Sequence, residues 1–386
     1  MKNFVSKTIQ DLPFSGIRKF FDVASEMKDV ISLGVGEPDF ITPWNIREEA
    51  IFSLEQRRTM YTSNAGMPKL RKEISRYMNT RYDLTYDPIT QVLVTVGASE
   101  GIDVALRAII DPGDEILVVE PCFVSYKPCV QMAGGVPVVV PTSAENDFRV
   151  TVEDIASRIT PKTKAIMLSY PNNPTGAIMP REDLQKVADL LKQHEIVVIS
   201  DEIYAELTYG DRAHVSIATL PGMYERTIVL NGFSKAFAMT GWRLGYACGP
   251  EDIIAAMTKI HQYILMCAPT TAQYGGIEAL RNSLPSVIAM QKEYDARRRY
   301  MLVELRKIGI DCFEARGAFY LFPSIGRFGL SSEEFCSRLL YEQHLAVVPG
   351  TAFGDSGEGH IRCSYAYSID NIKEALLRLE KFIKSL

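Results

Sequence analysis

Short apolar runs recur through the middle of the chain and are separated by more polar stretches. They are rich in Val, Ile and Leu and alternate little with polar residues, a pattern typical of strands that are buried on both faces of a sheet. The runs cover residues 91–97, 115–121, 136–141, 164–170, 195–204, 226–235 and 243–249. They predict a sheet of seven strands in one large domain.

Amphipathic helices are predicted between several of these runs. The stretch ASEGIDVALRAI that follows the first run places four apolar residues, from Ile102 to Ile109, on one helical face. Residues 180–194 begin with proline and acidic residues, as helices commonly do. This alternation of strands and helices predicts an α/β domain over residues 47–282, with a mostly parallel sheet between helices.

The C-terminal part of the chain, residues 283–386, has a different pattern. It predicts a long charged helix at 286–309, short strands near 311–323 and 345–349, and a final helix from residue 370. We therefore expect a smaller α+β domain here, joined by part of the N-terminal segment 1–46.

The composition is that of an ordinary soluble globular protein. Of the 386 residues, 47% are hydrophobic and 23% are charged, and the formal net charge is -5. This balance offers no basic patch for nucleic acid or an anionic membrane, and no apolar run approaches the ~18 residues of a membrane span. Because the N-terminus also lacks the apolar region of a signal peptide, we expect a cytoplasmic protein that acts on small molecules.

The spacing of cysteine and histidine gives no sign of a metal site or a disulfide framework. The seven cysteines are scattered without a C-x-x-C pair, which favours a reducing compartment. The five histidines show no H-E-x-x-H or similar ligand spacing. We therefore predict that no metal is bound.

Several chemically useful side chains follow the predicted strands. In an open parallel sheet, ligands bind at the carboxyl ends of the strands. An acid, a lysine, an arginine, hydroxyls and an aromatic ring lie there, within 97–100, 121–123, 170–175, 201–204, 234–235 and at residue 243. Each has an ordinary structural explanation, such as a helix cap, a surface lysine or a turn. Their conjunction at strand ends of one domain indicates a single binding site.

The motifs at these positions resemble those of a known family. The segments SLGVGEPDF, YTSNAGMPKLR, PNNPTG, SDEIYAEL, SKAFAMTGWRLGY and IRCSYA together span nearly the whole chain. In this combination they are similar to the class I/II aminotransferases of the pyridoxal phosphate fold type I superfamily, such as the aspartate and aromatic aminotransferases. The resemblance implies pyridoxal 5′-phosphate as cofactor, an amino acid and a 2-oxo acid such as 2-oxoglutarate as substrates of a ping-pong transamination, and a homodimer with shared active sites.

The resemblance also implies how the cofactor ring is held. Lys235 bonds to the cofactor aldehyde and, once released, carries a proton from the substrate Cα. Asp201 pairs with the pyridine nitrogen and keeps it protonated. Tyr204 and Asn173 bind the ring oxygen, and Phe123 stacks on the ring.

The remaining residues of the motif contact the phosphate and the substrate. Arg243, Ser234 and the amides of Ala98 and Ser99 at a helix start bind the phosphate, a task that suits a guanidinium and a helix N-terminus. By the same resemblance, Tyr61 reaches the phosphate of the neighbouring subunit. Arg362 binds the substrate carboxylate, with Gly36 and Asn173 beside it.

Substrate preference and alternative functions rest on finer signals. Ser99 stands where some aspartate aminotransferases carry a lysine, and residues 261–271 hold no arginine and are largely apolar. An aromatic or broad preference is therefore favoured over aspartate, with Arg18 or Lys19 as candidates for the distal carboxylate of the acceptor. A pyridoxal phosphate-dependent C–S lyase is less favoured, because such lyases tend to carry NPHNP in place of NNP. A cofactor-binding regulator that is not an enzyme is the least favoured alternative, since it needs a basic DNA-binding extension.

Overall fold

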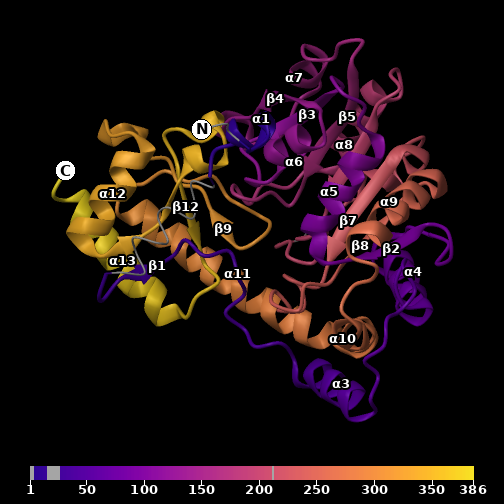
Figure 1. Cartoon of the computed structure of the whole chain (residues 1–386). Helices are drawn as coiled ribbons and strands as arrows, with labels where there is room; N and C mark the ends of the chain where they lie inside the picture. Colours follow the sequence, from indigo (N-terminus) through magenta and orange to yellow (C-terminus); the bar gives the residue numbers. More distant parts are fainter. Residues whose placement is uncertain (1–3, 15–26, 211–212) are drawn as a thin grey trace.

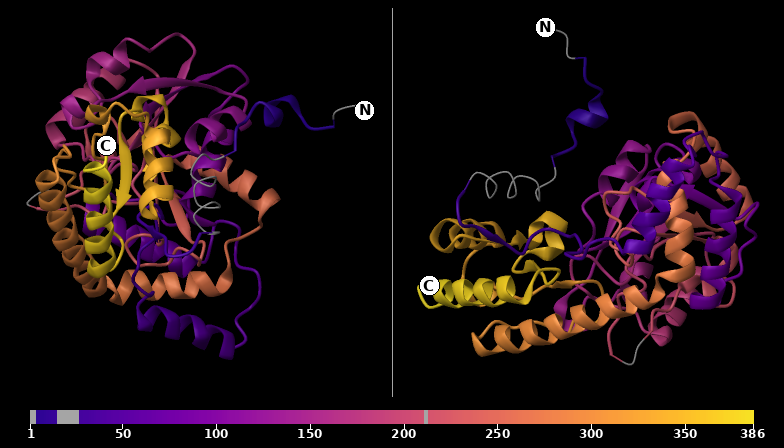
Figure 2. Two further views of the ribbon diagram at one scale, coloured as in Figure 1. Left: turned by 90° about the vertical axis from the view of Figure 1, so that its left-hand side faces the viewer. Right: turned by 90° about the horizontal axis from the view of Figure 1, so that it is seen from below.

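A computed structural model describes residues 4–14, 27–210 and 213–386. A large sheet flanked by helices occupies one side of the molecule, and a smaller group of helices and short strands occupies the other (Figure 1). The long helix α11, Leu284–Lys307, extends from the large sheet's side to the smaller group (Figure 2).

The large sheet contains seven strands in the order β2-β8-β7-β6-β5-β3-β4. The reversed strand β8 pairs antiparallel with β2 and β7, and the other pairings within the sheet are parallel. The strands span Val92–Thr95 (β2), Glu115–Glu120 (β3), Val136–Pro141 (β4), Thr163–Ser169 (β5), Val197–Asp201 (β6), Thr227–Gly232 (β7) and Gly245–Cys248 (β8). Each of them overlaps one of the seven apolar runs, so the predicted α/β fold with a mostly parallel sheet is confirmed.

One strand differs from the expectation of burial on both faces. β4 is the last strand of the sheet order, and Val136 at its start is 47% exposed. An edge strand has a neighbour on one side only, which permits such exposure, but β2 at the other end of the sheet order is buried along its whole length. The apolar run alone could not distinguish this edge from the centre of the sheet.

Helices cover both faces of the large sheet. One face packs against α5, α6 and α9, and the other packs against α4, α8 and α10, with α3 lying on α10. These helices bury apolar stripes, as in α5, where Ile102, Ala105 and Leu106 are buried. Their bounds are Trp44–Glu55 (α3), Pro68–Tyr82 (α4), Gly97–Ile109 (α5), Tyr126–Met132 (α6), Val152–Ala156 (α7), Arg181–Leu191 (α8), Glu251–Ile264 (α9) and Thr270–Asn282 (α10). A short helix, α1 (Lys7–Gln10), precedes them.

The smaller group has its own apolar core, built from one face of α11 and from α12, α13 and short strands. A three-stranded antiparallel sheet has the order β11-β12-β9, and β1 pairs in parallel with β10. The elements are Ile31–Ser32 (β1), Tyr320–Leu321 (β9), Ser332–Gln343 (α12), Leu345–Ala346 (β10), Val348–Pro349 (β11), Ile361–Ser364 (β12) and Ile369–Ile383 (α13). The predicted final helix is therefore present, and β1 brings the N-terminal segment into this group.

The sequence pattern missed β1 and β12, whereas β10 and β11 fall within the strand region expected at 345–349. β1 and β12 have two and four residues, and the expected strand at 311–323 is reduced to β9. Such strands are too short to show a periodicity, and their pairing partners are distant in sequence. The domain boundaries at 46/47 and 282/283 stay predictions. None of the described helices is long and apolar enough to cross a membrane.

Candidate active site

A cavity of about 390 Å³ lies at the carboxyl ends of the central strands, between the large sheet and the smaller group. Residues that follow β2, β3, β5, β6 and β7 meet there with residues of the N-terminal segment and of β12. Of the residues predicted from the sequence, the cavity is lined by Gly36, Ala98, Ser99, Phe123, Asn173, Asp201, Tyr204, Ser234, Lys235, Arg243 and Arg362. The predicted residues are thus brought together from across the chain, while their roles stay predictions.

Tyr61 lies outside this cavity. Its side chain is 78% exposed on the loop 60–67 before α4. Three side chains hold this loop to the segment around α10: Asn64 Nδ2 donates to Met266 O (2.8 Å), Thr270 Oγ1 to Met60 O (2.8 Å) and Gln273 Nε2 to Thr62 Oγ1 (2.9 Å). The structure therefore fixes the backbone near Tyr61 and leaves its ring available at the surface.

Asp201 ends β6 and is almost fully buried, with 5% exposure. Its Oδ2 accepts a hydrogen bond of 2.6 Å from the Tyr126 hydroxyl, and its Oδ1 accepts one from the Ile203 amide. Burial raises the pKa of Asp201 above its ordinary value, and the Tyr126 hydroxyl opposes that rise by stabilising the anion. A carboxylate in this setting is well placed to pair with a cationic ring nitrogen.

Lys235 lies three residues beyond the end of strand β7. Its Nζ donates to Gly36 O at 2.6 Å, a bond that joins the large sheet's side to the N-terminal segment. Burial lowers the pKa of Lys235 from 10.5 to about 8; Arg362 and Arg243 act in the same direction, while Glu37 opposes them. At pH 7 about a tenth of this amine is therefore neutral, roughly 300-fold more than for a lysine whose pKa is 10.5, and only a neutral amine attacks a carbonyl carbon.

The N-terminus of α5 forms one end of the cavity. Ala98 and Ser99 lie in its first turn, and Val96, the residue before the helix, provides no side-chain cap. Arg243 lies next to this turn, since a Cβ at Gly97 would come within 2.6 Å of its Nη2. Gly97 also has a φ of +76°, so both its backbone conformation and the space taken by Arg243 favour glycine at this position. The amides of this turn and the guanidinium together can bind an anion such as a phosphate.

The acidic residue in the same turn is engaged elsewhere. Glu100 accepts a hydrogen bond from the Val96 amide through Oε2, and its Oε1 bonds His261 Nδ1. It is not among the residues that line the cavity. Ser234, by contrast, lines the cavity and is 8% exposed.

Arg362 on β12 forms the opposite end of the cavity. Its Nη1 donates to Asn173 Oδ1 at 2.8 Å, its Nη2 donates to Gly34 O, and its Nε has no partner among the described residues. The guanidinium lies over the ring of Tyr320, at 4.4 Å, and over that of Phe353, at 4.7 Å. An arginine fixed in this way can bind a carboxylate through two parallel hydrogen bonds.

The sequence reasoning missed two tyrosines that line the cavity, Tyr126 and Tyr320. Tyr126 begins α6 three residues after Phe123, so the strand-end rule could have found it. Tyr320 lies on the two-residue strand β9, and its hydroxyl is 2.9 Å from the Tyr204 hydroxyl. Nothing in the pattern around GAFYLF singles it out. Arg18 and Lys19, considered for the distal carboxylate, lie outside the described residues.

The chemistry of this cavity is specific. It combines a partly neutral amine, a buried carboxylate, an anion-binding helix start and a carboxylate-binding arginine at the other end. The described residues contain no group of three or more His, Cys, Asp or Glu side chains that could hold a metal ion. The arrangement suits a phosphorylated carbonyl compound at one end and a small carboxylic acid at the other.

Comparison with known proteins supports the same interpretation. The chain is 53% identical over 383 residues to YugH of Bacillus subtilis (strain 168), which is named as an aminotransferase without a stated substrate; the match covers 99% of both chains. It is 46% identical to an aspartate aminotransferase of Pyrococcus abyssi, with 96% of both chains covered. The crystal structure of an aromatic aminotransferase of Pyrococcus horikoshii matches with a TM-score of 0.91 and 43% identity, covering 95% of this chain and 99% of that one. The family model described as "Aminotransferase class I and II" matches residues 28–379, and the chain belongs to this family.

Proposed function

We propose that this aminotransferase uses pyridoxal 5′-phosphate in the cavity around Lys235 and acts as a homodimer on aromatic or other large apolar amino acids. The observation that carries the cofactor proposal is that Lys235, half-buried and with a lowered pKa, lies in one cavity with the buried Asp201 carboxylate and the start of α5.

The cavity's residues fit this cofactor group by group. Arg243, Ser234 and the amides of the first α5 turn would hold the phosphate, and the missing Cβ of Gly97 leaves room for the guanidinium beside that turn. Asp201 would pair with the protonated pyridine nitrogen, and Phe123 would lie on the ring. When bound, the cofactor supplies an aldehyde carbon that takes up the amino group and a ring that withdraws electrons from the substrate Cα.

The chain's own residues account for the remaining steps. Arg362 binds the substrate α-carboxylate and so fixes the Cα in the cavity. Lys235 Nζ removes the proton from that Cα and later returns a proton in the reverse half of the reaction. The donor leaves as a 2-oxo acid, and an acceptor 2-oxo acid such as 2-oxoglutarate then leaves as the new amino acid.

Exposed apolar side chains support the homodimer. They lie in three places: on and just before α3, on the loop 60–67, and at the end of α9 and just beyond it. Asn64 on the loop 60–67 donates a hydrogen bond to Met266 O just after α9, so the second and third places are joined. The exposed side chains are Ile41, Trp44, Ile51, Phe52, Leu54, Met60, Tyr61, Tyr263, Ile264, Leu265 and Met266. A set of this size is typical of a surface that another protein covers, and a second copy would bring Tyr61 to the partner's phosphate. Light scattering behind a sizing column should give twice the 43.2 kDa chain mass; a monomer would contradict the proposal.

Substrate preference follows from the same surface. Tyr263, Ile264, Leu265 and Met266 are all at least 41% exposed and carry no positive charge, and Ser99 in the cavity is not a lysine. An apolar side chain gains from contact with such residues, whereas a second carboxylate without a cation is costly to bury. Aspartate is the second candidate, because the aspartate aminotransferase of Pyrococcus abyssi and an aromatic aminotransferase of Thermococcus litoralis are similarly close, at 46% and 43% identity.

The test measures kcat/KM for phenylalanine, methionine, alanine and aspartate with 2-oxoglutarate as acceptor. Phenylalanine and methionine should exceed aspartate; an aspartate advantage of ~100-fold, about 2.7 kcal/mol, would make this an aspartate aminotransferase. A 2-oxo acid product without free ammonia excludes the lyase alternative. Lys235→Ala should abolish turnover and keep the fold, and wild-type turnover in that variant would refute the site.

A further inference from the structure

We propose that Tyr320, on β9, is a positioning residue of the transamination: its hydroxyl orients the Tyr204 hydroxyl toward the cofactor, and its ring fixes the plane of Arg362. Tyr320 lines the cavity and is 1% exposed. The inference rests on the proposed function, in which Tyr204 bonds the cofactor ring oxygen and Arg362 binds the substrate carboxylate.

The hydroxyl pair has one preferred direction. Tyr320 Oη and Tyr204 Oη are 2.9 Å apart, so one of the two hydroxyls donates a hydrogen bond to the other. Tyr320 Oη also lies against Gly36, where a Cβ would overlap it. A carbon accepts no hydrogen bond, so a buried Tyr320 hydroxyl is best satisfied by donating to Tyr204. Tyr204 then keeps its own hydrogen for an acceptor in the cavity, and the incoming bond strengthens it as a donor.

The ring of Tyr320 contacts the second functional group. The Arg362 guanidinium carbon lies 4.4 Å from the Tyr320 ring centroid and 4.7 Å from that of Phe353. Both distances are within the range of cation–π attraction. With Nη1 on Asn173 and Nη2 on Gly34 O, the two rings restrict the remaining rotation of the guanidinium. Tyr320 therefore acts on the substrate end through its ring and on the cofactor end through its hydroxyl.

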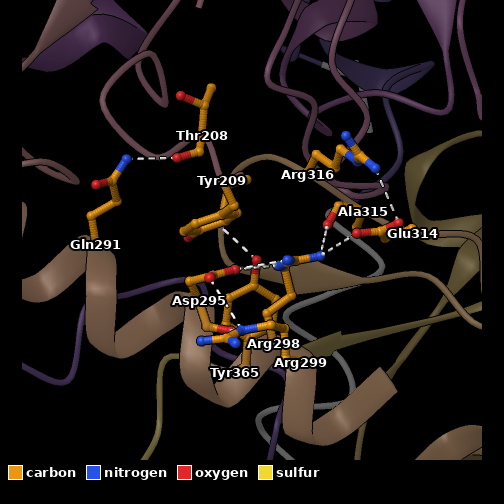
Figure 3. Close-up of polar contacts among 11 residues, drawn as sticks. Thr208, Tyr209, Gln291, Asp295, Arg298, Arg299, Glu314, Ala315, Arg316 and Tyr365 are labelled. Carbon is orange, nitrogen blue, oxygen red and sulfur yellow. Dashed lines mark hydrogen bonds and ion pairs between the residues drawn. The ribbon is translucent and has the colours of Figure 1, made fainter. Parts of the chain in front are cut away.

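The backbone before Tyr320 is held tightly enough for this purpose. Ala318, two residues earlier, has a φ of +58°, which is uncommon for a residue with a Cβ. Its carbonyl accepts from the hydroxyls of Tyr209 and Tyr365, and its amide donates to Leu207 O at 2.9 Å. Figure 3 shows the surrounding polar contacts, in which Arg298 of α11 donates to Ala315 O at 3.0 Å. These contacts fix the start of β9 to the segment that follows Tyr204.

The first experiment separates hydroxyl from ring with two variants of the cofactor-loaded enzyme. Tyr320→Phe removes the hydroxyl and keeps the ring. We expect the pH at which the absorption of the bound cofactor titrates to rise by about half a unit, because a weaker Tyr204 bond stabilises the ring oxygen's anion less. We expect kcat to fall about fivefold, the size of one neutral hydrogen bond, with KM values within about twofold of wild type. Tyr320→Leu should add a rise of about tenfold in KM for every amino acid, because Arg362 loses one aromatic face.

A matched control removes another buried hydroxyl from the same region. Tyr365 is fully buried and donates to Ala318 O at 3.2 Å, but it does not line the cavity. Tyr365→Phe should leave both the absorption titration and KM at wild-type values, because Ala318 keeps its bonds to the Tyr209 hydroxyl and to Leu207 O. A titration in Tyr320→Phe that equals wild type, or a shift of the same size in Tyr365→Phe, would overturn the proposal.

The second experiment uses the contact between Tyr320 and Gly36. In Gly36→Ala the new Cβ would overlap the Tyr320 hydroxyl, whereas the ring carbon Cζ lies at an acceptable 3.4 Å. Gly36→Ala should therefore raise KM at least about tenfold with the wild-type tyrosine, and adding Tyr320→Phe should recover most of that loss, as coupling between contacting residues requires. If the KM increase of the double variant equals the product of the increases in the two single variants, the Tyr320 hydroxyl does not lie against Gly36.

These outcomes are distinct from a failure of the proposed function. A wild-type protein without a cofactor absorption band, or without transamination, would refute the function. A wild type that titrates and transaminates, with Tyr320→Phe indistinguishable from it, would refute the role of Tyr320 alone.

Discussion

Lys235→Met should make the cofactor-free protein more stable below pH 8 and less stable above pH 10.5. The reason is the pKa of Lys235, which burial lowers from 10.5 to about 8. Below pH 8 the amine is charged in both the folded and the unfolded chain, so the folded state carries the full cost of the buried charge. As the pH rises from 8 to 10.5, the folded protein releases its proton first, and this cost disappears. Methionine keeps the apolar stem and never carries the charge.

The magnitude follows from the shift and from the bond that is lost. A change from 10.5 to about 8 corresponds to about 3.4 kcal/mol, and partial solvent exposure of the side chain reduces this to about 2 kcal/mol. The lost bond from Nζ to Gly36 O offsets about 0.5–1 kcal/mol of it. We expect a net gain of about 1–1.5 kcal/mol at pH 6.5, or about 1–2 °C in Tm, and a net loss of up to about 1 kcal/mol at pH 10.5.

The assay is thermal unfolding of cofactor-free wild type and Lys235→Met at several pH values between 6.5 and 10.5. Lys186→Met serves as control, since the Lys186 side chain is 67% exposed on α8. The Tm difference for Lys235→Met should shrink with rising pH and then change sign, while that of the control stays flat. A Lys235→Met difference that does not vary with pH would refute the claim that the amine's charge is costly in this cavity.

Three further predictions concern the same machinery and its support. Asp201→Asn keeps the shape but loses the anion, so kcat should fall at least ~100-fold, about 2.7 kcal/mol; a value within threefold of wild type would reduce Asp201 to a structural role. Arg362→Lys should raise KM for all amino acids by about 30-fold, because a lysine offers no bidentate fork; an effect limited to one substrate would contradict a role at the shared carboxylate. Glu206→Gln should lower stability by about 3 kcal/mol, since buried Glu206 accepts from Arg81, Tyr77 and Tyr82. Burial raises the pKa of Glu206, but these hydrogen bonds lower it further, so the pKa lies below its ordinary 4.5. The stabilisation by the Glu206 carboxylate is therefore present above pH 4.5 and is lost as the pH falls through the folded-state pKa. A Tm difference between Glu206→Gln and wild type that persists undiminished at about pH 3 would disprove this assignment.

The sequence determined the large sheet and most of the cavity because both depend on local patterns. Runs such as VLVT and VVISD bury both faces, so apolar content alone marks them as strands. Polar residues at the ends of parallel strands necessarily meet at one edge of the sheet. Lys235 and Asp201 could therefore be placed in one site before any coordinates were known.

Tertiary structure decided the contacts that join distant segments. Arg362 and Tyr320 lie on strands of four and two residues, too short for a periodic signal, and they reach the cavity only because β12 and β9 pair with each other and pack against the N-terminal segment. The lowered pKa of Lys235 is likewise a product of burial, which no spacing of residues specifies. The exposure of β4 depends on its place at the sheet edge, and strand order is set by packing between elements rather than by the sequence of any one of them.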